Sequence, residues 1–327
     1  MNWYLQSNEN SDVVKNTRIR LARNINGIKF DMTPSERVKL ENLIKENLFE
    51  IGYGLRFLKL SDMDKITKQS LIEKNLISKS FVIEENNTGS ILINDDENIC
   101  IMIGGKNHLS IQVFSEGLEL ENTLNLAIEI EEKIGELLGY CISKKYGYLT
   151  KSLNDIGTGL KTSVILELPA LYKTGNLRNV LDAVRDFNIN IDGDKYVYQI
   201  SNRQTIGITE KEIINNIKII ATKLMEQERK ARKILAKEEI ELDDIVNRSY
   251  GVLENCKKIS YDEANELLTN VKIGVDLGIF DKLTDLQIKK LFLYIKPANL
   301  QKYYGEEYDK IEQNIKRAKL IQKISNE

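Results

Sequence analysis

The chain has 327 residues, of which 42% are hydrophobic and 29% are charged. This composition is typical of a globular protein, excludes an intrinsically disordered chain, and at this length predicts two domains. The formal net charge of −2, from 47 basic and 49 acidic side chains, excludes an overall basic field that would hold nucleic acid or an anionic membrane. Any phosphate site must therefore be local.

The cysteines and the hydropathy indicate the compartment. Cys100, Cys141 and Cys256 lie far apart and form no CxxC pair, so neither a zinc ribbon nor a disulfide framework is indicated. The first ten residues have no signal-peptide pattern, and no later run reaches ~18 apolar residues. We expect a cytoplasmic protein that neither crosses a membrane nor binds nucleic acid.

The first part of the chain, up to about residue 205, mixes short β-like runs with amphipathic helices. Runs of β-branched residues separated by turn-forming residues indicate an antiparallel meander. The expected strands are 81–84, 90–93, 99–103, 109–113, 163–168 and 196–200, and the expected helices are 35–50, 121–145 and 176–187. Consecutive strands with helices between the blocks predict an α+β fold, an antiparallel sheet flanked by helices.

The remainder of the chain is helical in pattern. Thr209 with Glu212 forms a capping signature that begins a helix running toward Lys237. Helical periodicity returns at 260–277, 285–295 and 306–324. These segments predict a small all-helical carboxy-terminal domain at 236–327, after a first domain at 1–235.

Two basic features of the first domain suit phosphate. Arg18 and Arg20 alternate with apolar residues, so on a strand they project from one face about 7 Å apart, either as a phosphate clamp or as an ordinary solvated basic strand. The segment 157–162 (GTGLKT) offers two glycines and Lys161 to an anion. It is neither a Walker loop nor a GxGxxG element, and a plain tight turn also explains it.

The remaining candidates are ambiguous by themselves. His108 is the single histidine, which excludes a multi-histidine metal site, and a hydrogen-bonded residue at a strand start is its more common role. Glu116, Glu119 and Glu121 follow a strand and could receive a guanidinium, although a solvated helix entry is the more common role.

In order and spacing, several segments resemble the bacterial protein arginine kinases, a branch of the ATP:guanido phosphotransferases, over nearly the whole chain. They are 11–24 (SDVVKNTRIRLARN), 147–150 (GYLT), 156–160 (IGTGL), 198–207 (YQISNRQTIG), 248–253 (RSYGVL), 274–278 (GVDLG) and 296–302 (KPANLQK). The resemblance implies a phosphagen-kinase-like fold and transfer of the ATP γ-phosphate, with magnesium, to protein arginine. The nucleotide-binding candidates that it implies are Asn16, Thr17, Arg18, Ile19, Arg20, Asn75, His108, Lys161, Thr162 and Ser163.

The chain departs from this family where the family does its chemistry. The catalytic loop, Asn-Glu-Glu-Asp-His-x-Arg in the family, reads GGKNHLS at 104–110. Lys106 therefore replaces the catalytic carboxylate, Ser110 replaces a phosphate-binding arginine, and Ser152 replaces the reactive cysteine. No catalytic residue of the family remains at these positions.

Other motifs are altered as well. Asn75 replaces a base-contacting histidine, Lys161 replaces an arginine, and Asn154-Asp155 replaces Thr-Asn. A glycine-rich element is replaced by the acidic run 189–194 (INIDGD). The phosphoarginine motif is reduced to 313–318 (QNIKRA), of which Arg317 and Ala318 remain.

These departures predict a pseudokinase with a regulatory or partner-binding role. The alternative is an active kinase with a rearranged base, such as Glu116 or Glu119, which would need ATP and magnesium. The resemblance implies a protein partner, namely an arginine kinase, its zinc-finger activator or a phosphoarginine protein, and leaves a homodimer open.

Overall fold

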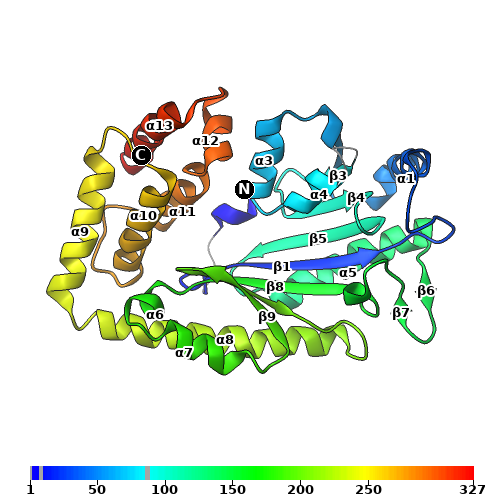
Figure 1. Ribbon diagram of the computed structural model, residues 1–327, viewed down its shortest axis with the longest axis horizontal. Helices are drawn as coiled ribbons and strands as arrows, with labels where there is room; N and C mark the ends of the chain where they lie inside the picture. The colour runs from blue at the N-terminus through cyan, green and yellow to red at the C-terminus, as the bar shows by residue number, and fades with distance from the viewer. Residues whose placement is uncertain (1, 7–9, 85–88) are drawn as a thin grey trace. The chain divides into compact units, whose positions relative to one another are not determined.

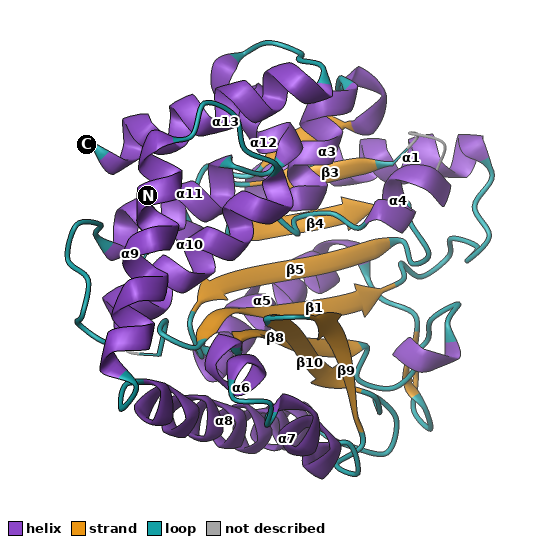
Figure 2. Ribbon diagram, turned by 60° about the vertical axis from the view of Figure 1, so that its left-hand side comes forward, coloured by secondary structure: helices purple, strands orange, loops and turns teal. Residues whose placement is uncertain are grey.

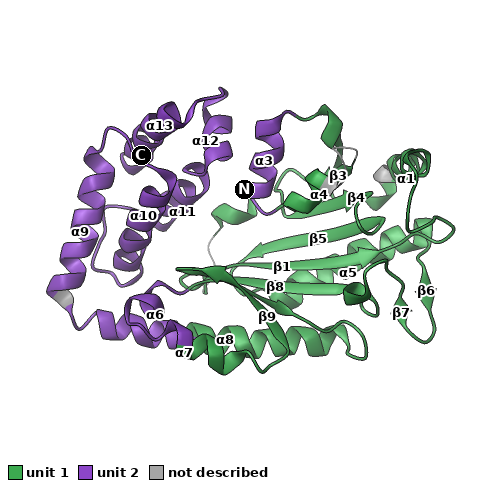
Figure 3. Cartoon of the chain, in the orientation of Figure 1, with its two compact units in different colours: residues 1–63, 76–167, 179–225 green, residues 64–75, 168–178, 226–327 purple. Residues whose placement is uncertain are grey.

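The computed structural model describes residues 2–6, 10–84 and 89–327. These divide into two compact units, shown in Figure 3. Unit 1 comprises residues 1–63, 76–167 and 179–225, and unit 2 comprises 64–75, 168–178 and 226–327. The domain boundary between residues 235 and 236 stays a prediction.

Unit 1 is built on an eight-stranded antiparallel sheet with the order β2-β3-β4-β5-β1-β8-β10-β9 (Figure 1). Its strands are β1 (Val14–Arg23), β2 (Arg56–Lys59), β3 (Ser90–Ile93), β4 (Ile99–Ile103), β5 (Leu109–Glu116), β8 (Leu160–Glu167), β9 (Ile189–Asp194) and β10 (Val197–Asn202). A separate hairpin joins β6 (Ile142–Ser143) to β7 (Gly147–Tyr148). The predicted α+β class with an antiparallel sheet is confirmed.

The central strand β1 has two chemically different faces. Ile19 and Leu21 are buried and lie opposite Val113 and Ile111 of β5. Helix α5 (Leu120–Leu138) packs against β1 and β5, and Figure 2 shows it behind the sheet. Because side chains alternate along a strand, Asn16, Arg18 and Arg20 project from the opposite face.

The other helices with residues in unit 1 vary greatly in length. They are α1 (Pro34–Glu46), α2 (Leu48–Ile51), α4 (Lys79–Glu84), α7 (Leu177–Val184) and α8 (Glu210–Leu235), with short 3-10 turns η1 (Trp3–Leu5), η2 (Leu60–Asp62) and η3 (Leu153–Asp155). The long helix predicted after Thr209 is confirmed as α8, which continues into unit 2. Both Thr209 bonds to Glu212 expected of a capping box are present.

Two local predictions were wrong. Residues 81–84 are helical, because Ser78 Oγ accepts the backbone N–H of Phe81 (3.1 Å) and so caps α4 despite the β-branched run. Helix α5 ends at Leu138, where Gly139 adopts φ 67°, instead of reaching residue 145. The acidic run 189–194, for which no secondary structure was predicted, forms β9. Most of the turn-forming segment 86–89, expected before the strand at 90–93, lies outside the described residues.

Unit 2 consists of helices around an apolar core. They are α3 (Lys65–Glu73), α6 (Pro169–Lys173), α9 (Glu239–Asn255), α10 (Tyr261–Asp276), α11 (Asp285–Tyr294), α12 (Pro297–Tyr304) and α13 (Lys310–Ser325). Val246, Leu268, Leu291 and Leu320 are fully buried in the core. Of the helices that the structure describes, none has both the length and the apolar run that crossing a membrane requires.

Candidate functional site

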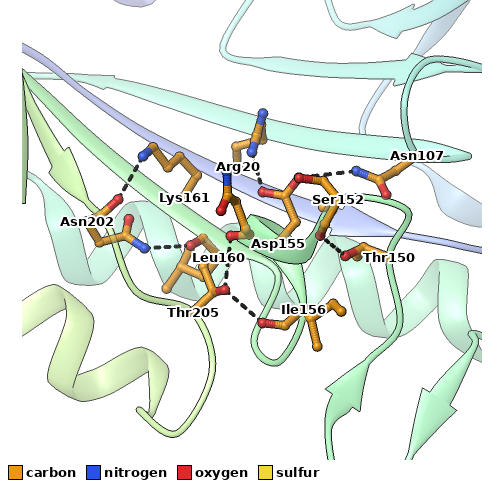
Figure 4. A network of polar contacts seen from close by, with 12 residues as sticks. Arg20, Asn107, Thr150, Ser152, Asp155, Ile156, Leu160, Lys161, Asn202 and Thr205 are labelled. Atoms are coloured by element: carbon orange, nitrogen blue, oxygen red, sulfur yellow. Dashed lines mark hydrogen bonds and ion pairs between the residues drawn. The ribbon is translucent and has the colours of Figure 1, made fainter.

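A group of cations lies on the face of the sheet opposite the buried side chains of Ile19 and Leu21. In the pairing register, Arg20 of β1 lies opposite Lys161 of β8, and Arg18 lies opposite Ser163. Arg18 Nη2 donates to Ser163 Oγ (3.4 Å), and Lys161 Nζ donates to the backbone carbonyl of Asn202 (2.7 Å; Figure 4). Three of the predicted nucleotide-binding cations therefore lie together on one face.

Burial and the crowding of these cations disfavour their positive charges. Burial and the neighbouring Arg20 lower the pKa of Arg18 to about 10. Burial lowers the pKa of Lys161 to about 8. The nearby Arg20, Arg18 and Arg203 lower it further, while Asp155 raises it. An anion on this face would relieve the repulsion, as expected of a phosphate-binding surface.

Asp155 places a negative charge on the same face. Its Oδ1 accepts from Arg20 Nη2 (2.8 Å), and its Oδ2 accepts from Asn107 Nδ2 (3.5 Å; Figure 4). Thr205 Oγ1 donates to the carbonyls of Asn154 (3.0 Å) and Ile156 (2.7 Å), which holds the turn carrying Asp155. The sequence showed the altered residue, but it gave no sign that this carboxylate pairs with Arg20.

His108 holds the neighbouring loop, residues 104–108. The ring is fully buried, Nδ1 accepts the backbone N–H of Ile25 (2.9 Å), and Nε2 donates to the carbonyl of Lys29 (2.9 Å). Burial lowers the pKa of His108, which favours the neutral ring that this arrangement requires. Both ring nitrogens are therefore engaged in fixing the loop to residues 25–29.

The same loop borders a cavity of about 610 Å³. The cavity is lined by residues 30–33 together with Arg37, Gly105, Lys106, Lys151 and Ser152. Arg37 Nη1 donates to the carbonyl of Gly104 (2.5 Å), a residue at φ 82°. Among the described lining residues Asp31 supplies the one carboxylate, and it forms an ion pair with Lys151. Lys106 thus borders the same cavity as Ser152, which sequence spacing could not show.

Several predicted nucleotide-binding residues lie elsewhere. Thr17, Ile19 and Thr162 point to the core side of the sheet, and Thr17 Oγ1 donates to the carbonyl of Gly117 (2.7 Å). Asn16 lies on the Arg18 face, opposite Glu116. Asn75, at φ 62°, follows α3 in unit 2.

Arg317 and Ala318 belong to α13 in unit 2. The Arg317 side chain is 2% exposed. Its Nε donates to the carbonyl of Ile295 (2.8 Å), and its Nη1 donates to the carbonyl of Ile259 (2.9 Å) and to Asn314 Oδ1 (2.7 Å). The guanidinium is therefore part of the helical core in this arrangement.

The chemistry of this cationic face of the sheet suits the phosphates of ATP. Buried Arg20 Nε and Ser110 Oγ have no hydrogen-bond partner within the described chain, which leaves polar atoms for a ligand. Across the same residues no group of three or more His, Cys, Asp and Glu side chains could hold a metal ion. Arg18, Arg20 and Lys161 would bind phosphate oxygens, while Asp155 opposes them.

The sequence matches two family models and several full-length relatives. Residues 39–231 match the family model "ATP:guanido phosphotransferase, C-terminal catalytic domain", and residues 239–326 match "Protein-arginine kinase McsB C-terminal domain". The protein-arginine kinase of Halothermothrix orenii is 39% identical, with 98% of this chain and 95% of that protein aligned. The protein-arginine kinase of Listeria welshimeri is 34% identical, with 98% and 96% aligned.

The fold is also that of a solved phosphagen kinase. The crystal structure of lombricine kinase superposes with a TM-score of 0.57 at 21% identity, over 70% of this chain and 69% of that one. At this identity the likeness concerns the fold alone. The family matches and the full-length relatives identify the chain as a member of the protein-arginine kinase family of ATP:guanido phosphotransferases.

Proposed function

We propose that this member of the family does not transfer phosphate to arginine and instead acts as a regulatory or partner-binding pseudokinase in the cytoplasm. One observation carries the proposal. The cavity beside the loop that holds the catalytic carboxylate in the family contains Lys106, and Asp31, the carboxylate among its described lining residues, pairs with Lys151.

Replacement of the family's catalytic carboxylate by Lys106 removes a group that phosphate transfer needs. Transfer to a guanidinium nitrogen needs a group that accepts a proton and orients the acceptor. A protonated lysine does neither, and it repels the guanidinium. Loss of a positioned base costs about 10² to 10⁴ in rate, and loss of a transition-state arginine such as the one replaced by Ser110 about 10³ to 10⁵. The losses do not multiply, yet one of the larger losses alone makes turnover negligible.

The retained cations support binding without transfer. Arg18, Arg20 and Lys161 still form a surface for phosphate oxygens, so ATP remains a candidate ligand, with magnesium needed for catalysis. The partner would be a protein, in keeping with the protein substrates implied by the names of its relatives. An arginine kinase, its activator or a phosphoarginine protein fits this role.

One alternative has its own structural support. Glu116 lies on the same face as Arg18, since it pairs with Asn16 two residues along β1. This carboxylate could serve as a rearranged base in an active kinase. Glu119 supports that role less well, because it lies at the start of α5 and accepts from Asn122 Nδ2 (2.9 Å).

A transfer assay tests both possibilities. Purified protein is incubated with γ-labelled magnesium-ATP and an arginine-rich protein, beside the Halothermothrix orenii relative as the positive control. We expect no label on arginine above background. Label that disappears in Arg18→Ala would refute the pseudokinase proposal, and its further loss in Glu116→Gln would establish the alternative.

A further inference from the structure

The cavity bordered by Lys106 carries a charge opposite to that needed for a guanidinium. Its described lining includes three cations, Arg37, Lys106 and Lys151, against the carboxylate of Asp31. Asp31 is already paired with Lys151. The balance of charge on the cavity wall is therefore positive, so an arginine side chain is repelled and an anionic side chain is attracted.

Hydrogen bonds hold Arg37 and the loop that carries Lys106. His108 ties the loop 104–108 to the backbone of Ile25 and Lys29, and Arg37 binds the carbonyl of Gly104. Arg37 itself comes from α1, whose first turn is set by the capping box between Thr33 and Glu36. Because this part of the cavity wall is held in advance, it loses less entropy on binding.

The cavity also presents apolar surface. Phe30 and Met32 line it and are half-buried, and Leu153, next to the lining residue Ser152, is 80% exposed. A free inorganic anion would use the cations alone. A peptide with acidic and apolar side chains would use both kinds of surface.

We infer that this cavity binds carboxylate side chains of an acidic segment of a partner protein. The inference rests on the proposed function, because it identifies the chemical class of the partner that a non-transferring family member would dock. Arg18, Arg20 and Lys161 of the sheet face are not involved, because they do not line this cavity. Because Lys106 replaces a carboxylate in loop 104–108, the cavity prefers an acidic segment of a partner over a basic one.

Calorimetric titration of the full chain with two matched peptides tests the inference. One is an eight-residue peptide of Asp, Glu and Leu, and the other replaces every Asp and Glu by Asn and Gln. We expect the acidic peptide to bind at least tenfold more tightly than its amide counterpart. Lys106→Glu and Lys151→Glu should each weaken the acidic peptide at least tenfold.

Lys144→Glu is the matched control, because Lys144 is an exposed lysine between β6 and β7 and gives the same change in net charge. It should leave binding unchanged. Lys106→Met, which removes the charge without reversing it, and a melting curve for each variant separate loss of binding from loss of fold.

Three results would overturn the inference: equal binding of the two peptides, no binding of either, or an equal loss with Lys144→Glu and Lys106→Glu. Displacement of the acidic peptide by inorganic phosphate at the peptide's own concentration would assign the cavity to phosphate and also overturn it. These outcomes are independent of the transfer assay. Phosphotransfer to arginine would refute the proposed function even if the acidic peptide binds, and failed peptide binding leaves the transfer result unchanged.

Discussion

Two regions of the molecule hold buried or half-buried cations, and they treat those charges differently. In unit 2, Arg232 donates to Glu228 (3.0 Å) and to Asp276 (2.9 Å), and Lys272 also donates to Asp276 (2.7 Å). On the sheet face of unit 1, Arg18 donates to a serine hydroxyl and Lys161 to a backbone carbonyl, and both lie beside Arg20.

The cations of unit 2 are paired in a way that stabilises the fold, whereas those of the sheet face are arranged in a way that suits an anionic ligand. In unit 2 the buried carboxylates and carbonyls compensate each cation, which is what stability requires. On the sheet face, burial and the nearby Arg20 lower the pKa values of Arg18 and Lys161. Such an arrangement costs stability in the free protein, and an incoming anion would recover it.

The largest expected effect concerns the paired charges of unit 2. Glu228 is fully buried and accepts the backbone N–H groups of Ala170 (3.0 Å) and Leu171 (2.9 Å) besides Arg232. Glu228→Ala leaves these donors unpaired, so the free energy of unfolding should fall by about 3–5 kcal/mol. Urea unfolding measures the change.

The control for this variant is Asp244→Ala, which breaks an exposed ion pair with Arg248 (3.1 Å). It should change the free energy of unfolding by about 0–1 kcal/mol. Similar values for Glu228→Ala and Asp244→Ala would remove the contrast between the two regions.

An intermediate effect is expected where Asp155 pairs with Arg20. Asp155→Asn keeps the size of the side chain and removes its charge, so Arg20 becomes available to phosphate oxygens. The affinity for magnesium-ATP should rise about tenfold, equivalent to about 1.4 kcal/mol. Calorimetric titration measures it, and Asp186→Asn, a charge-matched change at an exposed position, should have no effect. An unchanged affinity in Asp155→Asn would show that this carboxylate does not limit phosphate binding.

The smallest effect is a pH dependence. The pKa of Lys161 is lowered to about 8, so its positive charge is present below that pH and is lost as the pH rises through it. The affinity of the sheet face for tripolyphosphate should therefore fall severalfold between pH 7 and pH 9. In Lys161→Arg the charge persists, because arginine stays protonated over this range, and the fall should be absent. Equal pH profiles for the two proteins would exclude Lys161 as the titrating group.

Much of the fold was readable from local patterns. The β-branched runs at 90–93 and 99–103 became β3 and β4, and the capping residues at Thr209 marked the start of α8. The failures were also local. At 81–84 the capping bond from Ser78 outweighed β propensity, and the edge strand β2 (Arg56–Lys59) was too short to show a period.

By itself, the sequence determined which cations share a face of β1 and that a lysine stands where the family's loop has a carboxylate. Alternation along a strand concerns neighbouring residues, and the order of motifs is given by the chain itself, so both can be predicted without a structure. Only the tertiary structure decided that Asp155 reaches Arg20, 135 positions away, and that Lys106 shares a cavity with Arg37 and Lys151. It also decided that Arg317 donates to carbonyls of its own core. Contacts between distant segments depend on how the whole chain packs, and no local period encodes them.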